Sequence, residues 1–322
     1  MNDTKIKAYA CYNQDEAIRN KSTSGGIFYL VAKYVIENLN GYVCAAVFDK
    51  NFKVVHRITN RLQEVEQMLG SKYPQSALGN TFKEIKALLD RDEYVLFCGT
   101  PCQVNGLKSY LQKDYPNLLT LDFVCHGVAS PEIWDDYLTI FCDKSKLKSV
   151  RFKDKVKGWK RWHVKYQYEG KTHYCYGVND VFMRSYLSKI NHRPSCYSCK
   201  CKGMERRSDF TVADCWGEGE KNSRLNDDKG LSAFLIRTEV GIKVFDAVSS
   251  MLIYQEYDVN ILMKGNWAYI NNSEKPANRD AFFEVYSQAD LKQKKKIMKK
   301  NFGMTFKKWL SYLKMRIQGK VI

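Results

Sequence analysis

The chain has 322 residues, of which 44% are hydrophobic and 13% aromatic, so it can bury one large core or a main domain with a smaller appended one. Six prolines and 19 glycines leave no room for a long disordered linker, and we find no internal repeat. The net charge is +17, and no stretch is apolar enough for a secretion signal or a membrane-spanning helix, which predicts a basic, globular, cytoplasmic protein.

The first half of the chain alternates predicted helices and strands. Thr100 and Pro101 follow a strand and suit the cap and the first turn of the next helix. This alternation is typical of an α/β core. The predicted helices span about 24–39, 82–89 and 131–141, and the predicted strands span 41–48, 54–58, 94–97 and 118–124.

The second half of the chain has a different residue composition. After Lys148 the segments VRFKDKVKGW and WHVKYQYEGKTHYCY mix aromatic and charged residues and predict antiparallel strands. We therefore predict an α/β fold that becomes α+β in the second half, with a mixed-sheet core and an appended cysteine-bearing antiparallel region. The predicted division is an α/β domain over 1–147, a C-terminal domain over 148–290 and a basic amphipathic tail over 291–322.

The tail from Lys292 to Ile322 carries eleven Lys or Arg residues and no Asp or Glu. Two interpretations stay open: peripheral contact with an anionic membrane through 292–322, and a terminal helix packed on the body with a solvated lysine face. We recognise no pattern of a nucleic-acid-binding module, so no nucleic-acid partner is expected. The apolar residues of the tail at helical spacing are Phe306, Trp309, Leu310, Leu313 and Ile317.

Eleven cysteines are unusual in a chain expected to be cytosolic. Disulfides are rare in that compartment, so clustered thiols there indicate metal or redox chemistry. Isolated cysteines are instead expected to be small packed residues. The isolated ones are Cys11, Cys44, Cys142 and Cys175.

Two further cysteines follow neighbouring strands. Cys102 lies at the predicted start of a helix after one strand, and Cys125 lies at the end of the next strand. In an open α/β sheet such strand ends face one crevice, and a helix N-terminus stabilises a thiolate. Cys98, before the Gly-Thr-Pro turn, is expected to be packed at its strand end.

A third group reads PSCYSCKC, which places Cys196, Cys199 and Cys201 close together, with Cys215 fourteen positions on. A C-x2-C turn brings two sulfurs to one metal ion or to two corners of a cluster. Spacing leaves two alternatives: a local zinc knuckle of these four, or a set built from Cys196 and Cys199 with the two strand-end cysteines.

Six motifs of the sequence occur in a distinctive order. They are STSGGIF at 22–28, GSKYPQS at 70–76, FCGTPCQVNGLK at 97–108, LDFVCHGVASPEIWDDY at 121–137, CYSCK at 196–200 and SDFTVADCWG at 208–217. Together they resemble the coenzyme F420 hydrogenase/dehydrogenase beta subunit family, and the similarity runs from about Ala10 to Gly217. The resemblance implies an iron–sulfur flavoprotein with a [4Fe-4S] cluster and FAD.

The resemblance also implies which residues bind the cluster. The shared cysteines of the family match Cys102, Cys125, Cys196 and Cys199. Cys201 and Cys215 stand where relatives more often carry aromatic residues, so they remain alternates and keep the knuckle open. His126 beside Cys125 is expected to have a structural or supporting role, and no catalytic acid or base is assigned.

The implied flavin site uses small residues and a cation. Ser24, Gly25 and Gly26 open a helix whose N–H groups can approach a pyrophosphate. Ser71, Lys72 and Tyr73 supply a cation and hydroxyl groups, and Thr100 caps the helix of the cluster motif. No GxGxxG follows a strand, so the flavin is not held by the usual dinucleotide fingerprint.

The implied activity is electron transfer between the cluster, FAD and a hydride-accepting substrate, with a ferredoxin or another electron-transfer partner loading or draining the cluster. A single basic subunit resembles the stand-alone bacterial branch associated with polysaccharide synthesis, in which coenzyme F420 need not be the substrate. The alternatives are a zinc-knuckle binding protein and a scaffold without redox activity.

Overall fold

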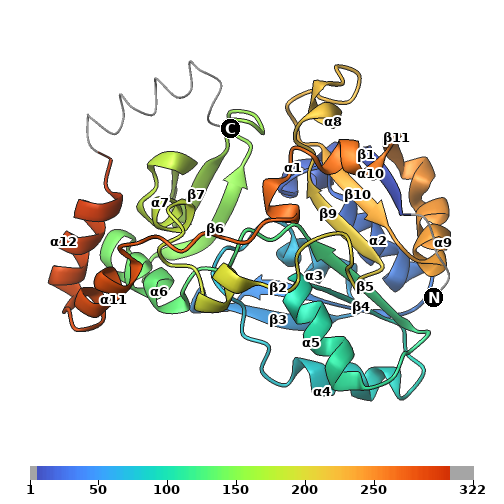
Figure 1. Ribbon diagram of the computed structural model, residues 1–322, viewed down its shortest axis with the longest axis horizontal. Coiled ribbons are helices and arrows are strands. Elements are labelled where there is room, and N and C mark those ends of the chain that lie inside the picture. Colours follow the sequence, from blue (N-terminus) through green and yellow to red (C-terminus); the bar gives the residue numbers. More distant parts are fainter. Residues whose placement is uncertain (1–5, 305–322) are drawn as a thin grey trace. The chain divides into compact units, whose positions relative to one another are not determined.

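The computed structural model describes residues 6–304 of the chain. These residues form two compact units, and each unit is discontinuous in sequence. The first unit contains the described parts of 1–126 and 198–273, drawn from blue to green and from yellow to orange in Figure 1. The second unit contains 127–197 and the described part of 274–322, drawn in green and red.

This division differs from the three segments predicted from sequence, 1–147, 148–290 and 291–322. The boundary expected near 147 falls between α6 (Pro131–Phe141) and β6 (Leu147–Asp154), and both elements belong to the second unit. The chain instead leaves the first unit after His126 and returns to it at Ser198.

The first unit is built on an eight-stranded mixed sheet. Strands β2, β4, β5 and β9 are parallel neighbours, whereas β3, β10, β1 and β11 pair antiparallel with theirs. The mixed-sheet core predicted from the sequence is therefore confirmed. In spatial order the strands are β11 (Leu252–Tyr257), β1 (Lys7–Asn13), β10 (Ser232–Ile236), β9 (Phe210–Asp214), β5 (Leu118–Phe123), β4 (Val95–Gly99), β2 (Tyr42–Phe48) and β3 (Val54–Thr59).

Helices cover both faces of this sheet. Successive side chains of a strand point to opposite faces, and in β2 Val43 joins the core under α2 and α9 while Cys44 joins the core under α4 and α5. The covering helices are α2 (Ile27–Glu37), α9 (Glu239–Val248), α4 (Thr81–Leu89) and α5 (Pro101–Leu111). The shorter helices of this unit are α1 (Glu16–Lys21), α3 (Leu62–Val65), α8 (Glu218–Lys221) and α10 (Val259–Met263).

Five strands of the sheet run in one direction. β1 is antiparallel to β10, and β10 is antiparallel to β9, so β1 runs with β9, β5, β4 and β2. The carboxyl ends of these five strands therefore lie at one edge of the sheet, where α/β proteins bind their ligands. We call this edge the carboxyl edge.

The second unit has an antiparallel sheet in the order β6, β7 (His163–Tyr168) and β8 (Lys171–Tyr176). Its core is aromatic: the Trp134 ring lies 5.3 Å from Phe152 and 4.6 Å from Phe182, measured between centroids. The predicted antiparallel region is thus confirmed. The helices of this unit are α6, α7 (Val181–Leu187), α11 (Arg279–Ser287) and α12 (Leu291–Phe302).

Most predicted elements agree with the structure within two residues. The helix over 131–141 has the predicted bounds, and the helix expected over 82–89 begins one residue earlier, at Thr81. The helix expected from Ser24 begins instead at Ile27, because Gly26 has a left-handed φ of 83° that interrupts helical geometry.

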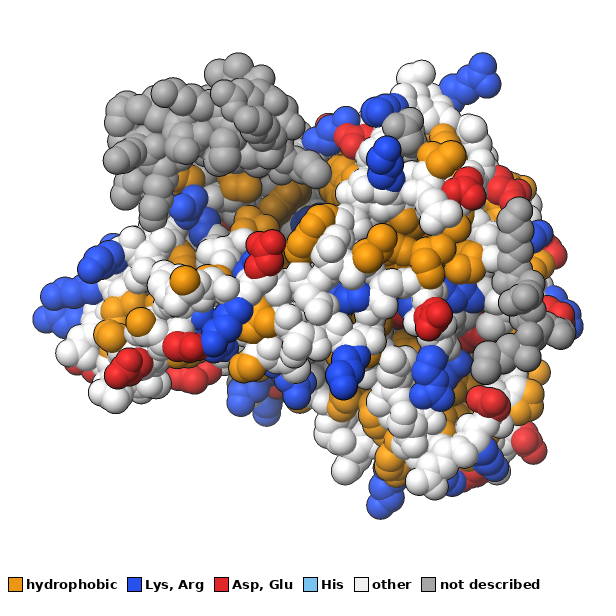
Figure 2. Space-filling view, in the orientation of Figure 1, with side chains coloured by type: hydrophobic (Ala, Val, Ile, Leu, Met, Phe, Trp, Pro, Cys, Tyr) orange, Lys and Arg blue, Asp and Glu red, His pale blue; other side chains and the backbone are white. Residues whose placement is uncertain are grey.

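The described part of the basic tail is α12, and the predicted apolar set from Phe306 to Ile317 lies outside the described residues. Met298 and Phe302 are buried against the second unit, and Lys294 pairs with Asp136 at 2.8 Å. Figure 2 shows basic side chains over α12. No helix among residues 6–304 is long and apolar enough to cross a membrane. The exposed lysines of α12 are Lys292, Lys295, Lys296, Lys299 and Lys300.

Candidate functional site

The Gly-Thr-Pro turn after β4 positions Cys102 at the carboxyl edge. Thr100 is the N-cap of α5 and Pro101 its first residue. The Thr100 N–H donates to the Gln103 side chain at 3.0 Å, the reciprocal half of a capping box. Cys102 therefore lies in the first helical turn, exposed, with its sulfur 3.1 Å from the Thr100 hydroxyl.

Cys201 lies beside this helix. Asn105 is three residues after Cys102, hence on the same face of α5, and its Nδ2 donates to the Cys201 sulfur at 3.3 Å. The backbone N–H of Cys201 donates to the Cys199 sulfur at 3.4 Å. Burial raises the pKa of Cys201, and the neighbouring thiols of Cys199 and Cys102 raise it further. The structure thus brings these three cysteines together.

Cys125 follows β5, the parallel neighbour of β4, so its loop is adjacent to the Gly-Thr-Pro turn. The Lys202 ammonium donates to the carbonyl of Cys125 and to that of Ala268. The residue after Cys201 therefore ties the Cys125 loop to the cysteine segment. His126, the next residue, is exposed.

Cys196 belongs to the second unit, in a short 3-10 helix spanning Pro194–Ser198, where its N–H donates to the Arg193 carbonyl at 2.8 Å. Only two residues separate it from Cys199, so their Cα atoms are within about 11 Å. Among residues 6–304 no three His, Cys, Asp or Glu side chains form a group that could hold a single metal ion.

Cys215 is fully buried at the end of β9. A Cβ atom on Gly219 would come within 2.2 Å of its sulfur. Burial raises its pKa to about 12, and the carboxylates of Glu220 and Asp214 add to the shift. Its neighbours therefore differ from those of Cys199 and Cys201, with which it was grouped in the knuckle alternative.

The two motifs expected to hold the flavin meet at the carboxyl edge. The Thr23 and Ser71 hydroxyls are 2.9 Å apart, and the Ser71 N–H donates to Thr23 Oγ1 at 2.7 Å. The Gln103 side chain donates to Ser76 Oγ at 2.9 Å, which joins the cluster motif to the same loop. Segments far apart in sequence thus converge here.

Gly25 and Gly26 are required by the turn before α2. A Cβ atom on Gly25 would lie 2.6 Å from the Cys11 carbonyl oxygen, and the Gly25 N–H donates to Ser232 Oγ at 2.9 Å. The Ser24 hydroxyl donates to the Leu231 carbonyl. Gly26 is the N-cap and has no side chain with which to cap the first-turn N–H groups of α2.

The Lys72 side chain is hydrogen-bonded to the loop that precedes it in the chain. Its ammonium donates to the carbonyls of Met68, Leu69 and Gly70 at 3.1, 3.2 and 3.2 Å, which uses all three of its N–H groups. Burial lowers its pKa to about 8. An incoming phosphate would have to displace one of these carbonyls. Tyr73, the next residue, is half-buried.

No sequence pattern pointed to His56, which lies in the same part of the first unit. A carbonyl can only accept, so the contact between His56 Nε2 and the Cys98 carbonyl, 3.2 Å, places the ring proton on Nε2. Nδ1 is buried and has no partner among the described residues. Burial lowers the His56 pKa to about 4, whereas burial raises the pKa of Cys98 to about 12, in keeping with a packed thiol.

The sequence analysis also did not predict a buried ion pair between Arg206 and Asp122. Arg206 Nη1 lies 3.1 Å from Asp122 Oδ1, and each of the two side chains is 1% exposed. The Arg206 guanidinium also lies 4.8 Å above the Tyr269 ring. Its Nη2 is buried without a hydrogen-bond partner among the described residues. The sequence shows only that basic residues, Lys202, Arg206 and Arg207, follow the cysteines, which does not reveal the burial of Arg206 or its pairing with Asp122.

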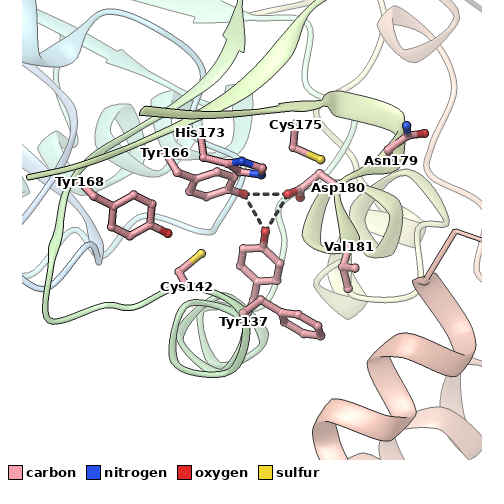
Figure 3. A pocket seen from close by; sticks show the side chains of 10 residues that line it. Tyr137, Cys142, Tyr166, Tyr168, His173, Cys175, Asn179, Asp180 and Val181 are labelled. Carbon is pink, nitrogen blue, oxygen red and sulfur yellow. Dashed lines mark hydrogen bonds between the residues drawn. The ribbon is translucent and has the colours of Figure 1, made fainter. Parts of the chain in front are cut away.

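The second unit contains a separate pocket of about 150 Å³. Figure 3 shows hydrogen bonds joining Tyr137, Tyr166 and Asp180: both hydroxyls lie within 2.8 Å of Asp180 Oδ2 and 2.9 Å from each other. Burial raises the Asp180 pKa. Its other oxygen caps α7 by accepting from the Met183 N–H at 2.9 Å. The pocket is also lined by Phe141, Cys142, Tyr168, His173, Cys175, Asn179 and Val181.

Comparison with known proteins agrees with this architecture. A chain in the structure described as the xenon derivatization of the F420-reducing [NiFe] hydrogenase complex from Methanosarcina barkeri is 17% identical, with a TM-score of 0.57, covering 88% of this chain and 92% of that chain. This match shows a shared fold. No curated protein matches the chain. The family model for the C terminus of the coenzyme F420 hydrogenase/dehydrogenase beta subunit matches residues 92–259, more than half of the sequence, and the chain therefore belongs to this family of redox-enzyme subunits.

Proposed function

We propose that the protein is a flavin-dependent oxidoreductase that passes electrons between a [4Fe-4S] cluster, FAD and a hydride-accepting substrate. The observation that supports this most directly is the convergence of the cysteine segment, the Gly-Thr-Pro turn and the two flavin motifs at the carboxyl edge of the first unit. Membership in a family of hydrogenase and dehydrogenase beta subunits supports a redox role.

The cysteines fit an iron–sulfur cluster better than a single ion. The thiolates of a cluster bind separate irons, so they need not meet at one point. Cys102, Cys125 and Cys199 would supply three ligands. The fourth is Cys196 in the set implied by the family resemblance, with Cys201 and Cys215 as alternates. Sulfur atoms that accept N–H groups, as Cys199 and Cys201 do, suit thiolate ligands.

Polar groups at the same edge fit a flavin nucleotide. The uncapped N-terminus of α2 after Ser24, Gly25 and Gly26 offers N–H groups to a pyrophosphate. Ser71, Lys72 and Tyr73 would flank the nucleotide, together with Thr100 at the start of α5. FAD, when bound, exchanges hydride with substrate and single electrons with a cluster. The unpartnered Arg206 Nη2 adds a buried donor suited to an anionic or carbonyl oxygen.

The partner would be a ferredoxin or another one-electron carrier. The similar chain is part of a hydrogenase complex, which is consistent with transfer to another protein. We further propose peripheral contact with an anionic membrane through 292–322, based on the exposed lysines of α12, and a substrate in polysaccharide synthesis, which the family resemblance alone supports.

Anaerobic purification followed by absorption spectroscopy and analysis of iron, sulfide, zinc and flavin tests this function. We expect flavin bands with a broad iron–sulfur shoulder, about four iron and about four sulfide ions per chain, and bound FAD. Zinc without flavin would instead establish the zinc-knuckle binding protein. A protein that contains no metal and no flavin would be a scaffold.

A further inference from the structure

The Asn13 side chain, at the end of β1, carries a buried hydrogen-bond donor for which the described residues supply no acceptor. Asn13 is 2% exposed, and its Nδ2 has no hydrogen-bond partner among residues 6–304. Its Oδ1 accepts from the Asp15 N–H at 2.9 Å, which assigns the other arm of the amide as the NH2 group. A buried donor that lacks an acceptor opposes folding, so it indicates an acceptor from outside the described chain.

Asn13 lies next to the N-terminus of α2. Its N–H donates to the Gly25 carbonyl at 2.8 Å, and a Cβ atom built on Gly26 would lie 3.3 Å from the Asn13 Cβ. Gly26 is the N-cap of this 11-residue helix and has no side chain with which to cap the first-turn N–H groups. The Asn13 Nδ2 is only two bonds from its Cβ, so this donor and the helix N-terminus belong to one site.

We propose that Asn13 Nδ2, together with the first-turn N–H groups of α2, donates to the pyrophosphate of FAD. This inference rests on the proposed function, and Asn13 lies outside the motifs from which the flavin site was predicted. A phosphate oxygen accepts several hydrogen bonds at once, and the partial positive charge at a helix N-terminus favours an anion there. A pyrophosphate at this position would therefore accept from the donor that the described residues leave without a partner.

The charged side chains near Asn13 in sequence are bonded to other groups. The Asp15 carboxylate caps α1 by accepting from two backbone N–H groups of that helix. The Arg19 guanidinium makes two hydrogen bonds to the Asp227 carboxylate, at 2.8 and 2.6 Å. Phosphate binding beside Asn13 would therefore depend on uncharged N–H donors, and removing one of them should weaken it strongly.

The test compares the wild type with Asn13→Asp and with a matched control, Asn117→Asp. Asn13→Asp keeps the oxygen that accepts from the Asp15 N–H and replaces only the NH2 group. Asn117 is also a buried asparagine, 7% exposed, but its Nδ2 donates to the Leu89 and Glu93 carbonyls at 3.1 and 2.8 Å. Asn117 also precedes β5, so it lies at the edge of the sheet opposite to the carboxyl edge.

Each full-length protein is depleted of flavin anaerobically, its melting temperature is measured, and it is titrated with three probes. FAD carries both the flavin ring and the pyrophosphate, riboflavin carries the ring without phosphate, and ADP carries the pyrophosphate without the ring. Asn13→Asp should weaken the binding of FAD and of ADP at least about tenfold, because it replaces a donor by a negative charge. The affinity for riboflavin should not change.

Stability should respond differently from affinity. The melting temperature of Asn13→Asp should equal or exceed that of the wild type, because Nδ2 has no partner among residues 6–304 to lose and a carboxylate is favourable at a helix N-terminus. Asn117→Asp should show the reverse pattern, with a lower melting temperature and unchanged affinity for all three probes, because it breaks two hydrogen bonds within the fold.

Unchanged FAD affinity in Asn13→Asp would overturn the inference while leaving the proposed function standing, and so would an equal loss of affinity for riboflavin. A wild-type protein that binds neither FAD nor riboflavin would remove the proposed function itself. If Asn13→Asp does not fold, Asn13→Ala removes the donor without adding a charge. It should weaken FAD and ADP several-fold and leave riboflavin unchanged, and full FAD affinity in this variant would also overturn the inference.

Discussion

The His56 imidazole is half-buried, and its protonation opposes folding. Its folded pKa of about 4 lies below the usual value of about 6.5, so between these values the unfolded chain binds more protons. The free energy of unfolding should therefore rise as the pH increases over this window. The contribution of His56 to stability should be lost as the pH falls through the same window. The shift corresponds to at most about 3 kcal/mol.

Replacing His56 by Gln tests this interpretation. Gln can still donate to the Cys98 carbonyl but carries no titrating group. Urea unfolding at several pH values between about 4 and 6.5 should show a shallower loss of stability in acid for the variant than for the wild type. Parallel curves would mean that His56 is not the group responsible.

The titration of Asp180 should change stability with pH in the opposite direction. The hydroxyls of Tyr137 and Tyr166 both donate to the Asp180 carboxyl and lie 2.9 Å from each other. Burial raises the pKa of this carboxyl, which favours its protonated form in the fold. Since the folded state then binds more protons, stability should decrease as the pH rises above about 3.9, the usual carboxyl pKa.

The variant Asp180→Asn should abolish this decrease, because the amide cannot ionise and Asn is a good N-cap for α7. At neutral pH its melting temperature should equal or exceed that of the wild type. Tyr137→Phe serves as the comparison, since it removes a buried hydroxyl and should cost about 1–2 kcal/mol. If Asp180→Asn were the more damaging of the two, the carboxyl would be ionised in the fold.

Among the elements, the start of α2 depends most on one backbone conformation. Gly26 has a φ of 83°, and a residue with a Cβ atom is destabilised there by about 1–2 kcal/mol. Gly26→Ala should therefore lower stability by about this amount and also reduce the flavin content, because the strain displaces the N–H groups proposed to face the pyrophosphate.

The control for this prediction is Gly170→Ala. Gly170 also has a positive φ, 67°, with nothing within 4 Å of an added Cβ atom, and it lies in the hairpin between β7 and β8 of the second unit. It should show a similar loss of stability with unchanged flavin. Equal flavin loss in both variants would indicate a general folding effect.

At the scale of the whole molecule, the charge of +17 is concentrated in part on α12, whose exposed face carries five lysines. Each lysine near an anionic bilayer contributes about 1 kcal/mol. Changing all five to Gln should sharply reduce binding to vesicles that contain anionic lipid and leave binding to neutral vesicles unchanged. The signal should also fall as salt is added.

A matched control changes five exposed lysines of the first unit to Gln, which removes the same net charge from other surfaces. If both variants lost binding equally, net charge alone would attract the protein to vesicles, and α12 would have no special role. The control positions are Lys7, Lys50, Lys83, Lys113 and Lys243.

The sequence predicted the elements whose formation depends on residues close to one another in the chain. The strands at β4 and β5 follow from apolar runs, and the start of α5 follows from Thr100 and Pro101. It could not find His56 or Arg206, because their burial depends on packing between segments distant in the chain. Nor could it find that the units are discontinuous, because the change in residue composition after Lys148 falls inside the second unit.

The connection between β5 and β9 has a consequence for the order of folding during synthesis. β5 pairs with β9 only after the whole 127–197 segment has emerged, and β1 finds its partners β10 and β11 still later, with Lys7 opposite Ile236. Contacts this distant in sequence form slowly. The nascent first unit must therefore hold β2, β4 and β5 with an unpaired sheet edge on the ribosome, a state in which intermediates aggregate most readily.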